Sequence, residues 1–346
     1  MQTRLEPVRS RHFPVLLVIG LLVVGLSVAE LALGPVAIAP GNVLAALAGG
    51  ESEYETAIIW QIRLPRLALG LAVGLALSLS GAALQGVLRN PLADPGLIGV
   101  TGGASLGAVA AIVLGGEVAG ALPHALRPWL LPVAAFVGAG VVIAFVFGLA
   151  RRQGETSIAT LILAGVAINA VAGAAIGAMV FISDDQQLRD LTFWTMGALG
   201  GTGWPLVIAS AGLAIVASPV IFAQARGLDL FQLGETAAFH AGLDVERAKL
   251  RIALATALSV GAVTAAAGPI GFIGLVAPHL ARLVVGPRHG TLLPAAVLMG
   301  IVLVLSADLA VRLVAPPAEP PIGLATSLIG GPFFLWLLLR RPSGHA

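Results

Sequence analysis

Charge is scarce in this chain. Of its 346 residues only 10% are Asp, Glu, Lys or Arg, whereas 58% are hydrophobic. Ordinary soluble domains contain about 25% charged residues, so a soluble fold of this composition would have too little polar surface to stay dissolved. The mean hydropathy of +0.99 agrees. The composition therefore predicts an integral membrane protein.

Cysteine is absent, and Lys249 is the only lysine. Without cysteine the chain has no disulfide framework, no Cys-based metal site and no thiol nucleophile. Lys249 follows Ala248, whereas a phosphate-binding loop of the G-x-x-x-x-G-K-[ST] type needs a glycine there. The chain therefore does not hydrolyse ATP by that route.

Other chemistry-bearing patterns are also missing. The sequence has no nucleophile–base pair, no metal-ligating constellation, and no basic stripe with interleaved aromatic residues. Such patterns are the usual signs of an active site or a nucleic-acid interface. We expect a chain that is not an enzyme, holds no cofactor or metal ion, and binds no nucleic acid.

Apolar runs of membrane-spanning length recur from end to end. A helix that crosses about 30 Å of hydrocarbon needs about 20 apolar residues. The run at 13–33 is longer than the core of a signal peptide, so we interpret it as a retained first helix. The sequence predicts an all-α membrane domain over 1–346 with ten spans, at about 13–33, 64–84, 96–114, 129–150, 157–182, 203–223, 250–268, 269–285, 291–313 and 322–339.

The basic residues support this count of spans. With both termini in the cytoplasm, 14 of the Lys and Arg residues fall on the cytoplasmic side and 5 on the other. Positive charge is enriched on the cytoplasmic side of membrane proteins. The outer five are Arg63, Arg66, Arg127, Arg189 and Arg312. An inner-membrane protein with cytoplasmic termini is therefore predicted.

The longest cytoplasmic connection, 224–251, is rich in charge. Its pattern predicts two short helices, at about 235–241 and 244–250. Gly242 separates them, and Asp244 is suited to cap the second.

A transporter needs a driving force, and few residues here suit an ion-coupled carrier. Such carriers keep ionisable groups within the membrane as a relay. The candidates are Glu30, His279 and Asp308, which are scattered along the sequence. Asp308 is expected to pair with an arginine, such as Arg312 at the i+4 position. Coupling to a separate ATPase through 224–251 is favoured, and an ion-coupled secondary transporter is the distant alternative.

Three blocks of sequence are similar to a known family. They are RLPR, GAALQ, RNPLADP and GVTGGA within 63–104, then GFIGLVAPHLAR at 271–282, then ADLAVR, EPPIG and GGPFF within 307–334. Together they resemble the permease subunit of type II ABC importers, the FecCD-like family that takes up iron–siderophores, haem and cobalamin. Pro320 is a small departure, since the family usually has leucine after the glutamate.

The resemblance implies an assembly as well as a fold. It implies a BtuC-like bundle of ten helices that forms a homodimer, with the translocation path at the dimer interface. Two ABC ATPase subunits would lie below and a periplasmic substrate-binding protein above.

The resemblance also assigns roles to the outer arginines Arg63, Arg66 and Arg312. It implies that they form salt bridges with glutamates of the binding protein, and the planar guanidinium suits carboxylate capture. The alternative is that they only reach toward the membrane interface.

On the cytoplasmic side the resemblance implies a coupling element that lies in a cleft of the ATPase. Its candidate residues are Glu235, Ala238, Gly242, Asp244 and Arg247. The alternative is a solvated connector between spans.

Thr156 and Ser157 open the fifth span, and in similar permeases the cytoplasmic gate lies near this point. The alternative is a helix cap, a position that favours Ser and Thr.

The segment at 183–197, SDDQQLRDLTFWTMG, most resembles haem importers of this family. Haem is therefore the expected substrate. Ferric siderophore and cobalamin are the alternatives.

Overall fold

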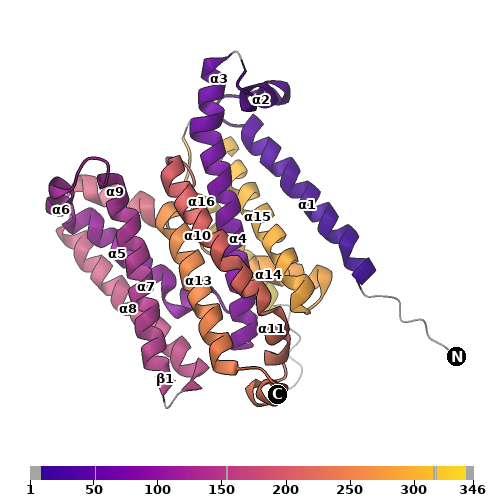
Figure 1. Cartoon of the computed structure of the whole chain (residues 1–346). Helices are drawn as coiled ribbons and strands as arrows, with labels where there is room; N and C mark the ends of the chain where they lie inside the picture. Colours follow the sequence, from indigo (N-terminus) through magenta and orange to yellow (C-terminus); the bar gives the residue numbers. More distant parts are fainter. Residues whose placement is uncertain (1–8, 51, 153–154, 315, 317, 340–346) are drawn as a thin grey trace.

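The protein, seen in a computed structural model, is described here over residues 9–50, 52–152, 155–314, 316 and 318–339. Almost all of it is helical (Figure 1). The elements are α1 (Arg9–Ala32), α2 (Pro40–Leu47), α3 (Glu53–Ala57), the π-helix η1 (Ile58–Arg63), α4 (Leu64–Leu88), η2 (Pro95–Ile98), α5 (Val100–Leu114), α6 (Gly116–Ala121), η3 (Arg127–Trp129), α7 (Leu130–Ala150), β1 (Arg151–Arg152), β2 (Glu155–Thr156), α8 (Ile158–Ile182), α9 (Asp185–Thr195), α10 (Trp204–Ala223), α11 (Ala225–Phe231), α12 (Glu235–His240), α13 (Val245–Ala267), α14 (Ile273–Val285), α15 (His289–Val314) and α16 (Ile322–Leu339).

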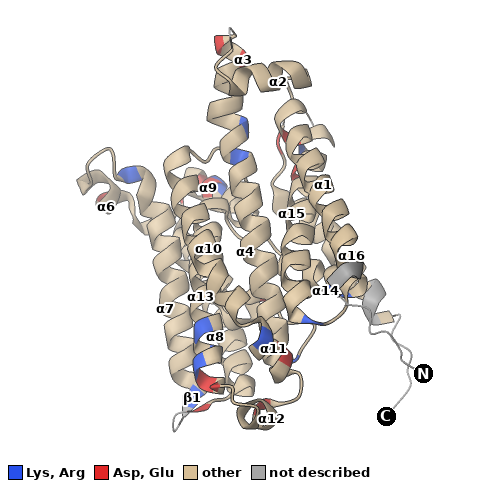
Figure 2. Ribbon diagram, turned by 45° about the vertical axis from the view of Figure 1, so that its right-hand side comes forward, with Lys and Arg blue, Asp and Glu red and all other residues tan. Residues whose placement is uncertain are grey.

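Charged residues gather toward the two ends of the bundle, and the middle of the long helices is nearly free of them (Figure 2). One end carries α2 and α3, and we call it the α3 end. The other carries α12 and the β1–β2 hairpin, and we call it the hairpin end. An apolar band between two charged ends is the arrangement that a bilayer requires.

Each of the ten predicted spans contains a helix. Within the described residues, seven helices are long and apolar enough to cross a membrane by themselves, and three apolar helices are shorter, Val100–Leu114, Ile273–Val285 and Ile322–Leu335. The chain is therefore a multi-pass helical membrane protein.

The predicted spans at 96–114 and 269–285 need correction. The first begins as the short 3₁₀-helix η2 and becomes the α-helix α5 only after Gly99, whose φ is +86°. The second loses its first residues, because φ is +72° at Gly268 and +67° at Phe272 and the helix begins at Ile273. Its 13 residues reach only about 20 Å. Irregular backbone at membrane depth is tolerated where protein covers it.

The start of the irregular segment before α14 packs against the turn that follows α9. The amide of Ala198 donates a hydrogen bond to the Ala267 carbonyl at 2.7 Å. A Cβ built on Gly268 would lie 2.3 Å from the Trp194 carbonyl oxygen, and one on Gly197 would lie 2.6 Å from the Pro269 carbonyl oxygen. The first residues of the break are thus covered by protein, whereas Gly271 is exposed.

Helix α4 forms the centre of the bundle and packs against α10, α13, α14 and α15. Its approach to α14 is very close, because a Cβ built on Gly81 would lie 1.8 Å from the Gly274 carbonyl oxygen. Small residues let helices pack in lipid, where no hydrophobic force drives them together. Gly81 and Gly274 thus allow the backbones of α4 and α14 to come into contact.

The connection at 224–251 differs from its prediction in two ways. Helix α12 matches the predicted helix at 235–241, and Gly242, with φ +87°, ends it. The predicted helix at 244–250 is the beginning of the long α13, because its apolar face continues without a break into the bundle. Helix α11 also lies in this connection and was not predicted.

Candidate functional site

The α3 end holds a cluster of three arginines and three carboxylates that joins α1, α4 and α15. Arg66 is held at its centre by Asp308, with Nε donating to Oδ2 at 2.7 Å and Nη2 donating to Oδ1 at 2.9 Å. Arg66 also pairs with Glu319. A bidentate arginine–carboxylate pair is among the strongest polar contacts in proteins.

The other two arginines hold α1 against the bundle. Arg312 pairs with Glu30 and donates to the Leu33 carbonyl, while Arg63 donates to carbonyls of Leu31 and Val36. These carbonyls lie at the end of α1 and just beyond it, where backbone acceptors lack helical partners. The cluster thus fastens α1 to α4 and α15.

Asp308 has a different main partner from the predicted one. Arg312 lies 3.8 Å away at the i+4 position, whereas Arg66 makes the bidentate pair. The spacing in sequence identified the near neighbour but could not identify Arg66, which is distant in sequence. Glu30 and Asp308 are thus both held in ion pairs with arginine.

The three arginines predicted to dock a binding protein lie together, but they are covered. Their relative exposures are 4% for Arg63, 6% for Arg66 and 3% for Arg312. Glu319, the partner of Arg66, is the more open group, with 39% of its side chain exposed. Docking by these arginines stays a prediction, and it requires the α3 end to open or Glu319 to be displaced.

A second cluster lies at the hairpin end and connects the β1–β2 hairpin, α12 and α13. Lys249 is buried and contacts Glu235, Glu246 and the Thr156 carbonyl. The predicted gate residues are adjacent to it. Thr156 is buried, and the Ser157 hydroxyl caps α8 by accepting from the Thr160 amide at 3.3 Å. The cap is therefore present at Ser157, and the gate stays a prediction.

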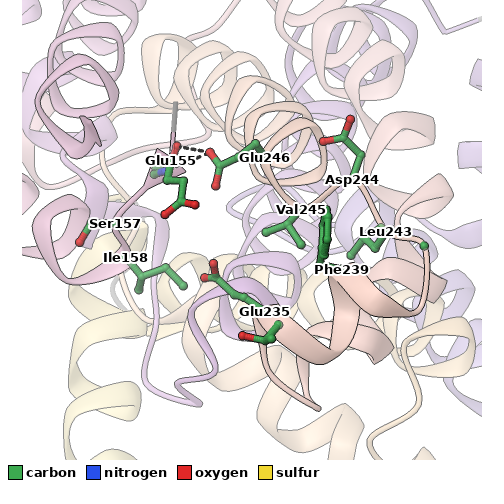
Figure 3. A pocket seen from close by; sticks show the side chains of 12 residues that line it. Glu155, Ser157, Ile158, Glu235, Phe239, Leu243, Asp244, Val245 and Glu246 are labelled. Atoms are coloured by element: carbon green, nitrogen blue, oxygen red, sulfur yellow. Dashed lines mark hydrogen bonds between the residues drawn. The ribbon is translucent and has the colours of Figure 1, made fainter. Parts of the chain in front are cut away.

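A cleft of about 1020 Å³ opens between the hairpin and α12. Glu155 and Glu246 line one side of it and Glu235 the other, with Phe239 and Asp244 nearby (Figure 3). Its walls therefore carry several carboxylates and the apolar side chains of Ile158, Phe239, Leu243 and Val245. Such a surface is suited to contact with a partner protein that presents basic groups.

The predicted coupling residues differ in their exposure. Ala238 is fully buried against its own chain, so its role is packing, and Phe239, 66% exposed, is the large residue that α12 presents outward. Asp244 caps α13, since its Oδ1 accepts from the Arg247 amide at 3.0 Å. Arg247 pairs with Asp244 and is exposed. The exposure of Phe239 was not predicted, because the sequence of a short helix does not tell whether an aromatic side chain faces the core or the surface.

Within the described residues, no group of three or more His, Asp or Glu side chains is arranged to hold a metal ion. Both charged clusters are held together by ion pairs.

An apolar helical bundle whose polar clusters lie at its two ends is the framework of a multi-pass membrane protein. The model of the FecCD transport family matches residues 21–340. The chain belongs to the FecCD transport family.

Relatives match over most of their length. The chain is 47% identical over 288 residues to the hemin transport system permease protein HmuU of Yersinia pestis, which covers 82% of this chain and 84% of that one. It is 43% identical over 298 residues to the cobalamin import system permease protein BtuC of Halobacterium salinarum, covering 86% and 77%.

A solved structure shows the same fold. It is described as an inward-facing conformation of a metal-chelate type ABC transporter, and it matches with a TM-score of 0.82 at 30% identity over 94% of this chain and 99% of that one. The chain is therefore a permease component of an ABC importer, a transport protein rather than an enzyme.

Proposed function

We propose that this chain is the membrane permease of an ATP-driven importer that carries haem into the cytoplasm. The observation that carries the proposal is the 47% identity to a hemin permease over most of both chains. The segment at 183–197, which forms α9 and the turn after it, resembles haem importers in its sequence. Cobalamin and ferric siderophore are the alternatives, and the 43% identity to a cobalamin permease favours the first of these.

The two charged ends support the proposal that a different partner protein binds at each end of the bundle. The α3 end would face the periplasm and receive the substrate-binding protein. The hairpin end would face the cytoplasm and receive two ABC ATPase subunits, with α12 as the coupling helix. The exposed Phe239 and the carboxylate-lined cleft support this assignment. Two copies would enclose the translocation path between them.

The proposed substrate is tested by uptake into proteoliposomes. The permease, its ATPase and its binding protein are reconstituted, and accumulation of haem, a ferric siderophore and cobalamin is measured with and without ATP. We expect ATP-dependent uptake of haem that exceeds uptake of the other two by at least about tenfold, a factor that about 1.4 kcal/mol of discrimination supplies.

A complex without ATPase measures the background. Preferred uptake of cobalamin or a siderophore would replace haem as the substrate without changing the class of transporter. Uptake driven by an ion gradient in the absence of ATPase would contradict the proposal as a whole.

A further inference from the structure

Lys249 is the only lysine of the chain and is buried at the hairpin end, with 3% of its side chain exposed. Its ammonium group has three N–H donors. Nζ lies 2.9 Å from the Thr156 carbonyl oxygen, 2.7 Å from Oε2 of Glu235 and 3.1 Å from Oε1 of Glu246. The three donors thus have three acceptors on three elements, β2, α12 and α13.

Glu246 completes the connection to the hairpin. Its Oε2 accepts from the Thr156 amide at 3.0 Å and from the Thr156 hydroxyl at 2.7 Å. Thr156 is therefore held through its amide, its hydroxyl and its carbonyl by two side chains from the first turns of α13. The chain passes from Thr156 directly into α8, so the same contacts fix the start of that helix.

Glu235 is the contact through which α12 enters this network. Helix α12 faces the hairpin across the cleft of about 1020 Å³ (Figure 3). The path from α12 to Thr156 therefore runs through Glu235 and Lys249. The Lys249 side of this contact is buried, whereas the Glu235 side chain is 34% exposed at the cleft. Charge-assisted hydrogen bonds are strong where water is excluded, as it is at the Lys249 side.

We propose that Lys249 is a positioning residue that transmits movement of α12 to Thr156 at the start of α8. The inference rests on the proposed function, in which α12 is the coupling helix, and on the cytoplasmic gate that the family resemblance implies near Thr156. When α12 shifts, the carboxylate of Glu235 draws the ammonium group with it, because its contact to Nζ, at 2.7 Å, is shorter than that of Glu246, at 3.1 Å. The Thr156 carbonyl, bonded to the same nitrogen, then moves as well.

The test compares Lys249→Met with Arg288→Met in the reconstituted complex with ATPase and binding protein. Arg288 is an exposed residue between α14 and α15, outside the 224–251 connection, and methionine preserves most of the length of either side chain. We expect Lys249→Met to assemble and hydrolyse ATP within about twofold of the wild type, while haem uptake per ATP falls by about tenfold, the order expected for losing a charged hydrogen bond. Arg288→Met should behave as the wild type.

A second measurement follows the gate directly and needs no substrate. Because the chain lacks cysteine, Ser157→Cys provides a single labelling site beside Thr156. Its rate of reaction with a maleimide should change on ATP addition in the otherwise wild-type complex. The change should be absent with Lys249→Met, reduced with Glu235→Gln, and partly restored with Lys249→Arg. The double variant of Glu235→Gln and Lys249→Met should lose no more of the ATP-dependent change in labelling rate than Lys249→Met alone. Both substitutions break the same contact between Glu235 and Lys249, so their effects should not add.

Two results would overturn the inference and leave the proposed function intact. One is an unchanged ATP response of Ser157→Cys and unchanged uptake per ATP in Lys249→Met. The other is loss of assembly and ATP hydrolysis in both Lys249→Met and Glu235→Gln, which would make the network purely structural. If the wild-type complex itself shows no ATP-driven uptake and no ATP response, the proposed function fails instead.

Discussion

At the scale of the residue, the pairing of Arg66 with Asp308 is the feature most open to test. Both side chains are buried, and each satisfies the other in a bidentate contact. Removing one partner of a buried pair typically costs about 3–5 kcal/mol. Without Asp308, Arg66 would keep only its pair with Glu319, whose side chain is 39% exposed. We expect Asp308→Asn to lower the thermal unfolding temperature of the purified permease markedly.

The double variant Arg66→Met with Asp308→Leu should recover part of that loss, because the one carboxylate that loses Arg66 as its partner, Glu319, has 39% of its side chain exposed to solvent. Arg189→Gln, which changes an exposed arginine of α9, is the control and should leave the unfolding temperature almost unchanged. Equal effects of Asp308→Asn and Arg189→Gln would show that the pair contributes little.

At the scale of the element, the approach of α4 to α14 predicts a steric effect. A Cβ on Gly81 has no room beside the carbonyl of Gly274, whereas a Cβ on Gly148, within α7, meets nothing within 4 Å. We expect Gly81→Ala to destabilise the bundle by about 1–3 kcal/mol or more, as overpacking does, and Gly148→Ala to be neutral or slightly stabilising. Thermal unfolding and the yield of monodisperse protein measure both, and a neutral Gly81→Ala would refute the close packing.

Much of the fold could be predicted from the sequence, but less of the candidate site could be. Hydrocarbon thickness sets a minimum length, so apolar runs located each span. The break before Ile273 was placed a few residues early, since Gly268 and Pro269 mark a turn but Phe272 is an unusual residue at positive φ. Helix α9 was missed, although Asp184 and Gln187 form a capping box that the sequence displays. The Arg66–Asp308 pair joins distant parts of the chain, and spacing along a sequence carries no such information.

At the scale of the whole molecule, the proposed orientation predicts which end a membrane-impermeant reagent reaches. His240→Cys, on α12, and Glu117→Cys, on α6, are exposed single sites in a chain without cysteine. In intact spheroplasts that express the permease alone, an impermeant maleimide should label Glu117→Cys and spare His240→Cys, because positive charge retains the hairpin end in the cytoplasm. Permeabilised cells, in which both sites should react, provide the control, and the reverse pattern in intact spheroplasts would invert the topology.

The continuous helix formed by α3, η1 and α4 reaches beyond what a bilayer needs. It runs from Glu53 to Leu88, 36 residues or about 54 Å, against a hydrocarbon thickness of about 30 Å. If the apolar part after Arg66 fills the bilayer, the first 14 residues stand above it as a post about 20 Å tall with the arginine cluster at its foot. In the proposed dimer, a protein that binds this face would need a groove for each of two such posts, so the shape of its contact surface would be set before any charge is matched.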